Sequence, residues 1–432
     1  MNEILLSVLQ IAIASILAFL ILRRPYLGIA LTATSLPVID LLPPIPLLTS
    51  AVPLIGAITL VGFMLHRVME PEKPLFSFGS VHILGLLFIG WMFLVNPQAA
   101  WFGATRNWVL TFLQLWVLAW LAGELLDTPE KHHVFMWVYS IGTITSALVV
   151  IQQGKIGEDI DTSLRVSGFA GGANSAARYF VVAIVFLSYL RTVMNQRLPR
   201  LLAIVGMTVT IIGVFLTVSR TGILLLFAAL GLLVLLRPRR KHQFQLIFVF
   251  AIALFALWFL ADSIFDIVKS IIPAITQGTD TVGVRYGLWQ AGWRMWLDNI
   301  LQGVGIGLYP EQLRYYAQDL LPVRFWSVGA HNMYVQVLAE TGLIGFGLFV
   351  LLLIMSLRNI WRAGNINDVN IFSLRNVWFI VFLVMLLGGI TKNDHFDKLI
   401  WLVMGISVYF HNQLQMRTQK TAVYNPARSV QV

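Results

Sequence analysis

The chain of 432 residues is 58% hydrophobic and only 12% charged, and its mean hydropathy is +0.79. A soluble domain carries about 25% charged residues, so this composition excludes a soluble protein and predicts an all-α polytopic membrane protein. The absence of cysteine excludes disulfides, thiolate metal sites and cysteine nucleophiles. The net charge of +10 would suit a nucleic-acid partner, so its distribution along the chain has to be considered.

The apolar stretches predict about 12 or 13 membrane-spanning helices, at roughly 20 residues each. A proline-rich stretch at 26–45 is either a short span or a re-entrant segment, which leaves the side of the N-terminus open. The clearer spans run near 4–22, 46–66, 78–96, 106–126, 132–152, 174–192, 200–218, 220–236, 243–264, 332–357, 372–391 and 396–413.

These spans divide the chain into four parts. Residues 1–264 form N-terminal transmembrane helices that include a hairpin at Arg220. Residues 265–331 form a large periplasmic loop, and residues 332–413 form C-terminal transmembrane helices. The remaining part, 414–432, is a cytoplasmic tail that we expect to be disordered.

Basic residues orient the spans, because lysine and arginine concentrate in short cytoplasmic loops. The run from Arg237 to Lys241 is the strongest such signal. Alternation of the spans then places more than half of the 30 lysines and arginines inside, including Arg23, Arg24, Arg67, Lys131, Arg191, Arg197, Arg200, Arg358, Arg362 and Arg375. The positive charge is therefore a topology signal, and it predicts no nucleic-acid partner.

The outward loop at 265–331 is far longer than an ordinary connection and indicates a functional segment. Within it, Trp289, Trp293 and Trp296 recur at helical spacing. They predict either an amphipathic helix at the membrane surface or a packing helix inside the loop. The glycine-rich stretch 303–307 (GVGIG) lacks the spacing of a dinucleotide fingerprint, and we interpret it as a backbone hinge.

Two arginines face outward at span boundaries. Two short spans that meet at 218–222 (VSRTG) place Arg220 at the outer edge of the membrane, and Arg285, with Tyr286 beside it, lies in the loop. Paired guanidinium groups suit a pyrophosphate, although Arg220 could instead bind headgroups and Arg285 could form a loop ion pair. Arg178 is either a third contributor or the interhelical partner of an acid.

His331 stands where the long loop re-enters the membrane. Asn332, Gln336 and Glu340 follow at a spacing of four, which predicts one polar stripe on an apolar helix. The stripe indicates either a pocket in the bundle interior or interhelical hydrogen bonds. Asp394 belongs to a polar turn at 392–398 (KNDHFDK), which either lines the same site or is a solvated turn.

These motifs resemble those of the O-antigen ligase and O-antigen polymerase family, which includes bacterial O-linked oligosaccharyltransferases. The resemblance covers roughly 200–360, and its motifs are 218–222 (VSRTG), 303–307 (GVGIG), 330–336 (AHNMYVQ) and 338–345 (LAETGLIG). It implies a GT-C type glycosyltransferase fold in the bacterial inner membrane, with an active site that faces the periplasm. The residues that match the essential ones of the ligase branch are Arg220, Arg285 and His331.

The resemblance further implies an enzyme that moves a glycan from undecaprenyl pyrophosphate to a lipid A core sugar, without metal or cofactor. Arg220 and Arg285 would bind the pyrophosphate, and His331 would take the proton of the attacking hydroxyl. Arg178, Asn332, Gln336, Glu340, Asp394 and Tyr286 are the candidate substrate contacts. Because no carboxylate is obviously placed as a nucleophile, we expect one displacement with inversion.

Three alternatives remain at this stage. A polymerase and a protein oligosaccharyltransferase need the same carrier contacts and differ only in the acceptor. A small-solute transporter is the alternative from another class. The sequence offers no inverted repeat for a transporter, and its polar residues gather at one membrane face rather than at the midplane.

Overall fold

The computed structural model of this chain describes residues 2–42, 51–70, 72, 78–95, 104–153, 166–236, 281–363 and 369–424. Every regular element in these ranges is a helix, which confirms the all-α prediction. Six helices are long and apolar enough to cross a membrane, and four shorter apolar helices accompany them. These apolar helices are typical of a polytopic membrane protein. The expected span at 243–264 lies outside the described residues.

The six candidate spans lie in α6 (Ala104–Leu125), α7 (Pro129–Gln153), α8 (Ala173–Val193), α9 (Arg197–Leu216), α14 (Met333–Arg362) and α15 (Val369–Gly388). The shorter apolar helices are the part Ala12–Arg23 of α1 (Asn2–Arg23), α3 (Val52–Val68), α4 (Ser80–Val95) and α10 (Arg220–Leu235). The other elements are α2 (Tyr26–Thr34), η1 (Ile39–Leu41), α12 (Thr281–Asp298), α13 (Tyr309–Tyr316), η3 (Val323–Phe325) and α16 (Lys398–Tyr424).

Most expected spans agree with these helices to within a few residues, but the expected tail does not. We expected disorder after 413, and this expectation is wrong for part of the tail, because α16 continues as a helix to Tyr424. Loss of apolar character therefore does not end this helix, since polar residues such as glutamine, lysine and arginine are good helix formers.

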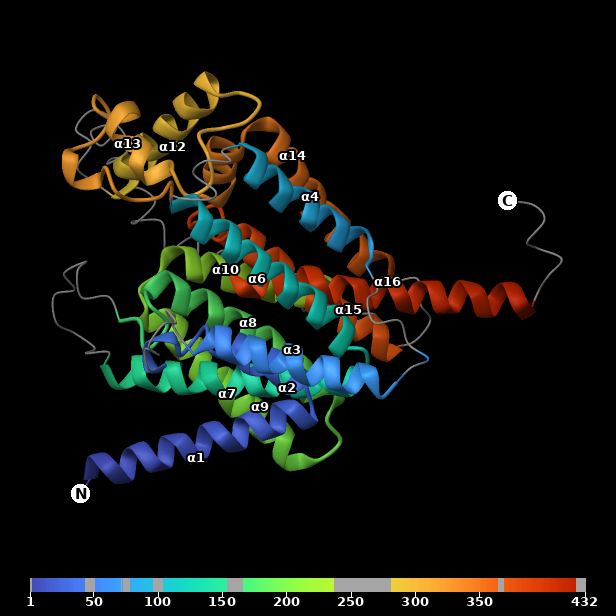
Figure 1. Cartoon of the computed structure of the whole chain (residues 1–432). Helices are drawn as coiled ribbons and strands as arrows, with labels where there is room; N and C mark the ends of the chain where they lie inside the picture. Colours follow the sequence, from blue (N-terminus) through green and yellow to red (C-terminus); the bar gives the residue numbers. More distant parts are fainter. Residues whose placement is uncertain are drawn as a thin grey trace.

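The helix α8 lies at the centre of the bundle. Of its apolar stretch, 83% is buried, and it contacts α7, α9, α10 and α15. In Figure 1 the long helices run side by side, with α1 along one edge and α4 and α14 together along the other. Large apolar side chains stay exposed on the edge helices, among them Phe19 of α1, Leu65 of α3 and Leu87 of α4. Such a surface is suited to lipid.

The loops gather at two opposite ends of the bundle. At one end, His133 Nε2 of α7 lies 3.1 Å from the hydroxyl of Tyr189 in α8, and Asn376 donates to the carbonyl of Leu236 at 2.8 Å. The same end holds the cations Arg23, Arg24, Arg67 and Lys131 around one cavity. We call it the basic end. The loops at the basic end are among those that the distribution of lysine and arginine predicted to lie on the same side of the membrane.

The stretch 26–42 runs from the basic end to the opposite end. It starts with α2 beside Arg24, and at its far side Asp40 donates its backbone N–H to the Phe169 carbonyl at 3.1 Å. The Asp40 carboxylate also accepts from Gly171 N–H at 3.1 Å. Of the two interpretations of the proline-rich stretch, this arrangement fits the short span, because the chain traverses the bundle.

The segment from α12 to η3 forms a small subdomain with its own core. This core is built by Leu288, Met295, Tyr309 and Leu313, each with no exposed surface. Figure 1 shows α12 and α13 lying together beside the beginning of α14. The packing helix is confirmed, because α12 packs inside the subdomain, and Trp293 remains 53% exposed on its other face. The position of this helix at a membrane surface stays a prediction.

Candidate functional site

Arg220 stands at the first residue of α10, at the end of the bundle opposite the basic end. The preceding Ser219 caps α10 by accepting from Gly222 N–H at 3.1 Å, and its hydroxyl donates to Asn174 Oδ1 of α8 at 2.8 Å. Arg220 is exposed and forms no ion pair with any residue in the described ranges. The predicted junction of two short helices is confirmed, and it presents a cation beside a helix N-terminus, where anions are favoured.

Lys392 approaches the same first turn of α8 from the other side. Its Nζ donates to the hydroxyl of Ser175, the residue after Asn174. Burial, together with the neighbouring cation Arg178, lowers the pKa of Lys392 to about 8, while Asp397 opposes this shift. Ser219, the residue before Arg220, and Lys392 therefore bind two consecutive residues of α8, Asn174 and Ser175.

Arg178 is buried and forms ion pairs with both aspartates of the turn between α15 and α16. Its guanidinium contacts Asp394, and Nη2 lies 2.9 Å from Asp397 Oδ2. The hydroxyl of Tyr179 donates to the same Asp397 oxygen at 3.0 Å. Of the two interpretations of Arg178, the structure has the interhelical ion pair, which fixes the turn that carries Lys392.

The beginning of α14 is fastened to this turn. Asn332 caps the helix, since its Oδ1 accepts from Tyr334 N–H at 3.0 Å and from Val335 N–H at 3.2 Å. Its own N–H donates to Asn393 Oδ1 at 3.0 Å, and Met333 N–H donates to the Gly389 carbonyl at 2.8 Å. The polar side chain of Asn332 is thus engaged in holding His331 in place.

His331 has a left-handed backbone conformation, with φ of 49°. Such a conformation is uncommon for a residue with a side chain and persists where the surrounding contacts impose it. The side chain is exposed at the surface, and partial burial followed by the charges of Arg285 and Lys392 lowers its pKa. A histidine with a lowered pKa is neutral at pH 7 and able to accept a proton.

Arg285 reaches this site from the first turns of α12. One turn further along, Trp289 Nε1 donates to the carbonyl of Ala330 at 3.0 Å, which ties α12 to the residue before His331. Arg285 is half-buried, whereas Tyr286 beside it is 46% exposed. The structure therefore brings Arg285, His331 and Lys392 to one place.

The polar stripe on α14 is buried, and of its two interpretations the arrangement fits hydrogen bonding inside the protein rather than a pocket. Gln336 Oε1 accepts from Ala330 N–H at 3.0 Å, and Gln336 Nε2 donates to Glu340 Oε1 at 3.0 Å. The same carboxylate oxygen accepts from Tyr309 N–H at 3.3 Å. These side chains hold Ala330 and Tyr309 of the long loop against α14, because a buried polar group has to find partners within the protein.

The helix α14 is broken at Gly342, where φ is 64° and ψ is −169°. The carbonyls of Ala339 and Glu340 lose their helical partners and accept from Val304 and Gly305 N–H, each at 2.9 Å. The glycine-rich stretch 303–307 therefore packs against α14 at this break and donates backbone hydrogen bonds to it. A side chain at Gly303 would lie 2.5 Å from the backbone of Glu340, so close approach requires glycine.

Lys392 acts on His331 together with the predicted Arg285, but Lys392 was not singled out from the sequence. From the polar turn at 392–398, Asp394 was named as the candidate substrate contact. In the structure Asp394 is paired with Arg178, and Lys392 contributes to the field at His331. In the described ranges, no three histidine, aspartate or glutamate side chains cluster as metal ligands.

Comparison with known families gives one match. Residues 205–350 match the model of a family described as O-antigen ligase. No curated protein sequence matches the chain. The matched stretch contains Arg220, Arg285 and His331, together with the broken part of α14.

Proposed function

We propose that this chain, whose residues 205–350 match the O-antigen ligase family, is a member of that family and joins a glycan from undecaprenyl pyrophosphate to a lipid A core sugar. The family supports the general activity of a membrane glycan transferase. Reaction at the periplasmic face of the bacterial inner membrane, the GT-C type fold and the identities of donor and acceptor belong to our proposal.

The observation that carries this proposal is the position of His331. It is exposed, it has a pKa below the usual value, and it lies within the field of the cations Arg285 and Lys392. A site that holds a neutral base next to fixed positive charge suits a reaction in which a hydroxyl is deprotonated while an anion leaves.

In the proposed reaction, the acceptor hydroxyl transfers its proton to His331 as its oxygen attacks the anomeric carbon of the donor glycan. A bond forms between this oxygen and that carbon, and the bond from the carbon to the pyrophosphate oxygen breaks. Arg220 and Arg285 stabilise the negative charge of the departing carrier pyrophosphate, a task for which a divalent metal is the common alternative. Attack opposite the leaving group inverts the anomeric configuration.

The other candidate residues have supporting roles in this proposal. Tyr286 is exposed beside Arg285 and is placed to contact the donor. Arg178 and Asp394 fix the turn that carries Lys392, and Gln336 and Glu340 fix the loop around His331. We assign all four to positioning rather than to contact with the reacting atoms, because each is buried and forms a hydrogen bond or an ion pair inside the protein.

Reconstitution of the protein in liposomes with an undecaprenyl-pyrophosphate glycan tests the proposal. Lipid A core, an acceptor protein and a second donor molecule are offered together, and the expected product is glycan on lipid A core. Product on the second donor would assign a polymerase, and product on the protein would assign an oligosaccharyltransferase. Retention of the donor's anomeric configuration would contradict the single displacement, and loss of activity in a chelator would contradict the metal-free mechanism.

A further inference from the structure

A polar cavity lies at the basic end, on the opposite side of the bundle from His331. Its volume is about 410 Å³. It is formed where α1 meets α2, where α3 ends, and where α6 turns into α7, with Asn412 of α16 contributing from a fourth side. The reaction proposed above uses none of these residues.

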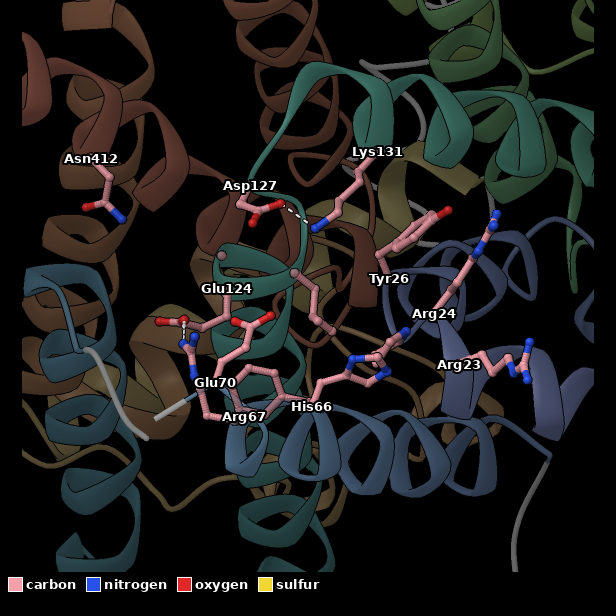
Figure 2. Close-up of a pocket in the computed structure, with 14 residues that line it drawn as sticks. Arg23, Arg24, Tyr26, His66, Arg67, Glu70, Glu124, Asp127, Lys131 and Asn412 are labelled. Atoms are coloured by element: carbon pink, nitrogen blue, oxygen red, sulfur yellow. Dashed lines mark hydrogen bonds and ion pairs between the residues drawn. The ribbon is translucent and has the colours of Figure 1, made fainter. Parts of the chain in front are cut away.

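The charges around this cavity do not balance among the described residues. Arg67 pairs with Glu124, and Lys131 pairs with Asp127 at 2.5 Å. Arg23 and Arg24 are exposed and form no ion pair with any residue in the described ranges. In the view of Figure 2 the two arginines lie on one side of the cavity, with the carboxylates on the other. Four cations (Arg23, Arg24, Arg67 and Lys131) and three carboxylates (Glu70, Glu124 and Asp127) line the cavity, which leaves a net charge of +1. Arg23 and Arg24 are the cations available to an anionic group.

Apolar surface leads away from these two arginines. On α1, directly before Arg23, Ile16 is 59% exposed and Phe19 is 55% exposed. On α3, which packs against α1, Leu65 is 53% exposed. A ligand that fills the cavity with an anionic group and covers this surface has to be amphiphilic, with hydrocarbon chains attached to its charged part.

We propose that this cavity binds the phosphate headgroup of an anionic phospholipid, with its acyl chains along α1 and α3. Guanidinium groups donate paired hydrogen bonds to phosphate oxygens. Basic pockets between helices at the cytoplasmic side of a membrane are suited to such headgroups. The site would hold a structural lipid at the face opposite the one where glycan transfer is proposed, and it does not depend on that function.

Native mass spectrometry of the detergent-solubilised full-length protein tests this inference with phosphatidylglycerol and phosphatidylcholine as probes. We expect one phosphatidylglycerol to be retained per chain in preference to phosphatidylcholine. The double variant Arg23→Gln/Arg24→Gln should lose affinity by about tenfold or more, the effect of removing charge-assisted hydrogen bonds. The charge-conserving Arg23→Lys/Arg24→Lys should keep most of the binding.

The matched control is Arg191→Gln/Arg197→Gln, which removes two exposed cations from the same end without touching the cavity. It should bind phosphatidylglycerol like the parent. Equal loss in this control, or unchanged binding in Arg23→Gln/Arg24→Gln, would overturn the proposal. Displacement of the lipid by an equimolar amount of glycerol 3-phosphate would also overturn it, because the site would then recognise free phosphate rather than a lipid. Thermal unfolding of each variant establishes that it is folded.

Discussion

His331 is held by its neighbours on both sides of the chain, since Ala330 accepts from Trp289 and Asn332 is bonded to Asn393. These contacts impose the left-handed backbone at His331. We predict that His331→Ala lowers the rate of transfer by about 10²- to 10⁴-fold, the usual contribution of a positioned base. Binding of the carrier should persist, because the arginines remain. Activity equal to that of the parent would exclude the role as base.

For the arginines we predict a different result. Arg220→Ala and Arg285→Ala should weaken both carrier binding and transfer, because each removes positive charge that the pyrophosphate needs before and during bond breakage. Tryptophan-fluorescence titration with a pyrophosphate-linked carrier, run beside the transfer assay, separates the two effects. A loss of transfer with unchanged carrier affinity would place these arginines elsewhere in the mechanism.

Lys392 should control the pH profile of the reaction. Its positive charge lowers the pKa of His331, so His331 stays neutral to lower pH in the parent than in Lys392→Met. The acid limb of kcat/KM should therefore move to higher pH in the variant. Arg197→Met at the basic end is the control, and identical profiles in all three proteins would contradict this role.

At the scale of elements, the break in α14 is the feature that positions the loop. Leu343 N–H donates to the Ile300 carbonyl at 2.8 Å, and the carbonyl of Thr341 accepts from Trp91 Nε1 at 2.8 Å. The backbone groups released by the break are thus satisfied by the subdomain and by α4. A broken helix of this kind is stable in a membrane protein because its polar groups find partners inside the protein.

Gly342→Ala should therefore destabilise the protein by about 1–3 kcal/mol, the cost of overpacking and of a left-handed backbone that alanine disfavours. The added methyl group would overlap the carbonyl of Leu301. Gly347→Ala is the matched control in the same helix, since nothing lies within 4 Å of a Cβ there. Thermal unfolding in detergent should show a loss for the first variant and none for the second. Equal stability would mean that the break is not required.

At the scale of the whole molecule, hydropathy predicted the all-α class and the limits of most apolar helices in the described ranges. The limits of α7, α8 and α9 agree with the expected spans because bilayer thickness imposes a length on an apolar helix. The break at Gly342 was not predicted, since the sequence does not show whether a glycine inside an apolar stretch has a negative φ, which continues the helix, or a positive φ, which ends it. Lys392 was missed for a related reason: only the fold shows that Arg178 and Lys392 both approach Asp394 and that the charge of Lys392 acts on His331.

The two ends of the bundle should lie on opposite sides of the membrane, and the native chain lacks cysteine, so single cysteines report their side without background. Tyr315 of α13 is 59% exposed beside the proposed site, and Arg197 is exposed at the basic end. We predict that a membrane-impermeant maleimide labels Tyr315→Cys in intact spheroplasts and labels Arg197→Cys only after permeabilisation, because cytoplasmic loops carry the basic residues. Transfer activity of both variants serves as the control for folding. Labelling of both cysteines from the same side would contradict the orientation, and with it the periplasmic location of the proposed site.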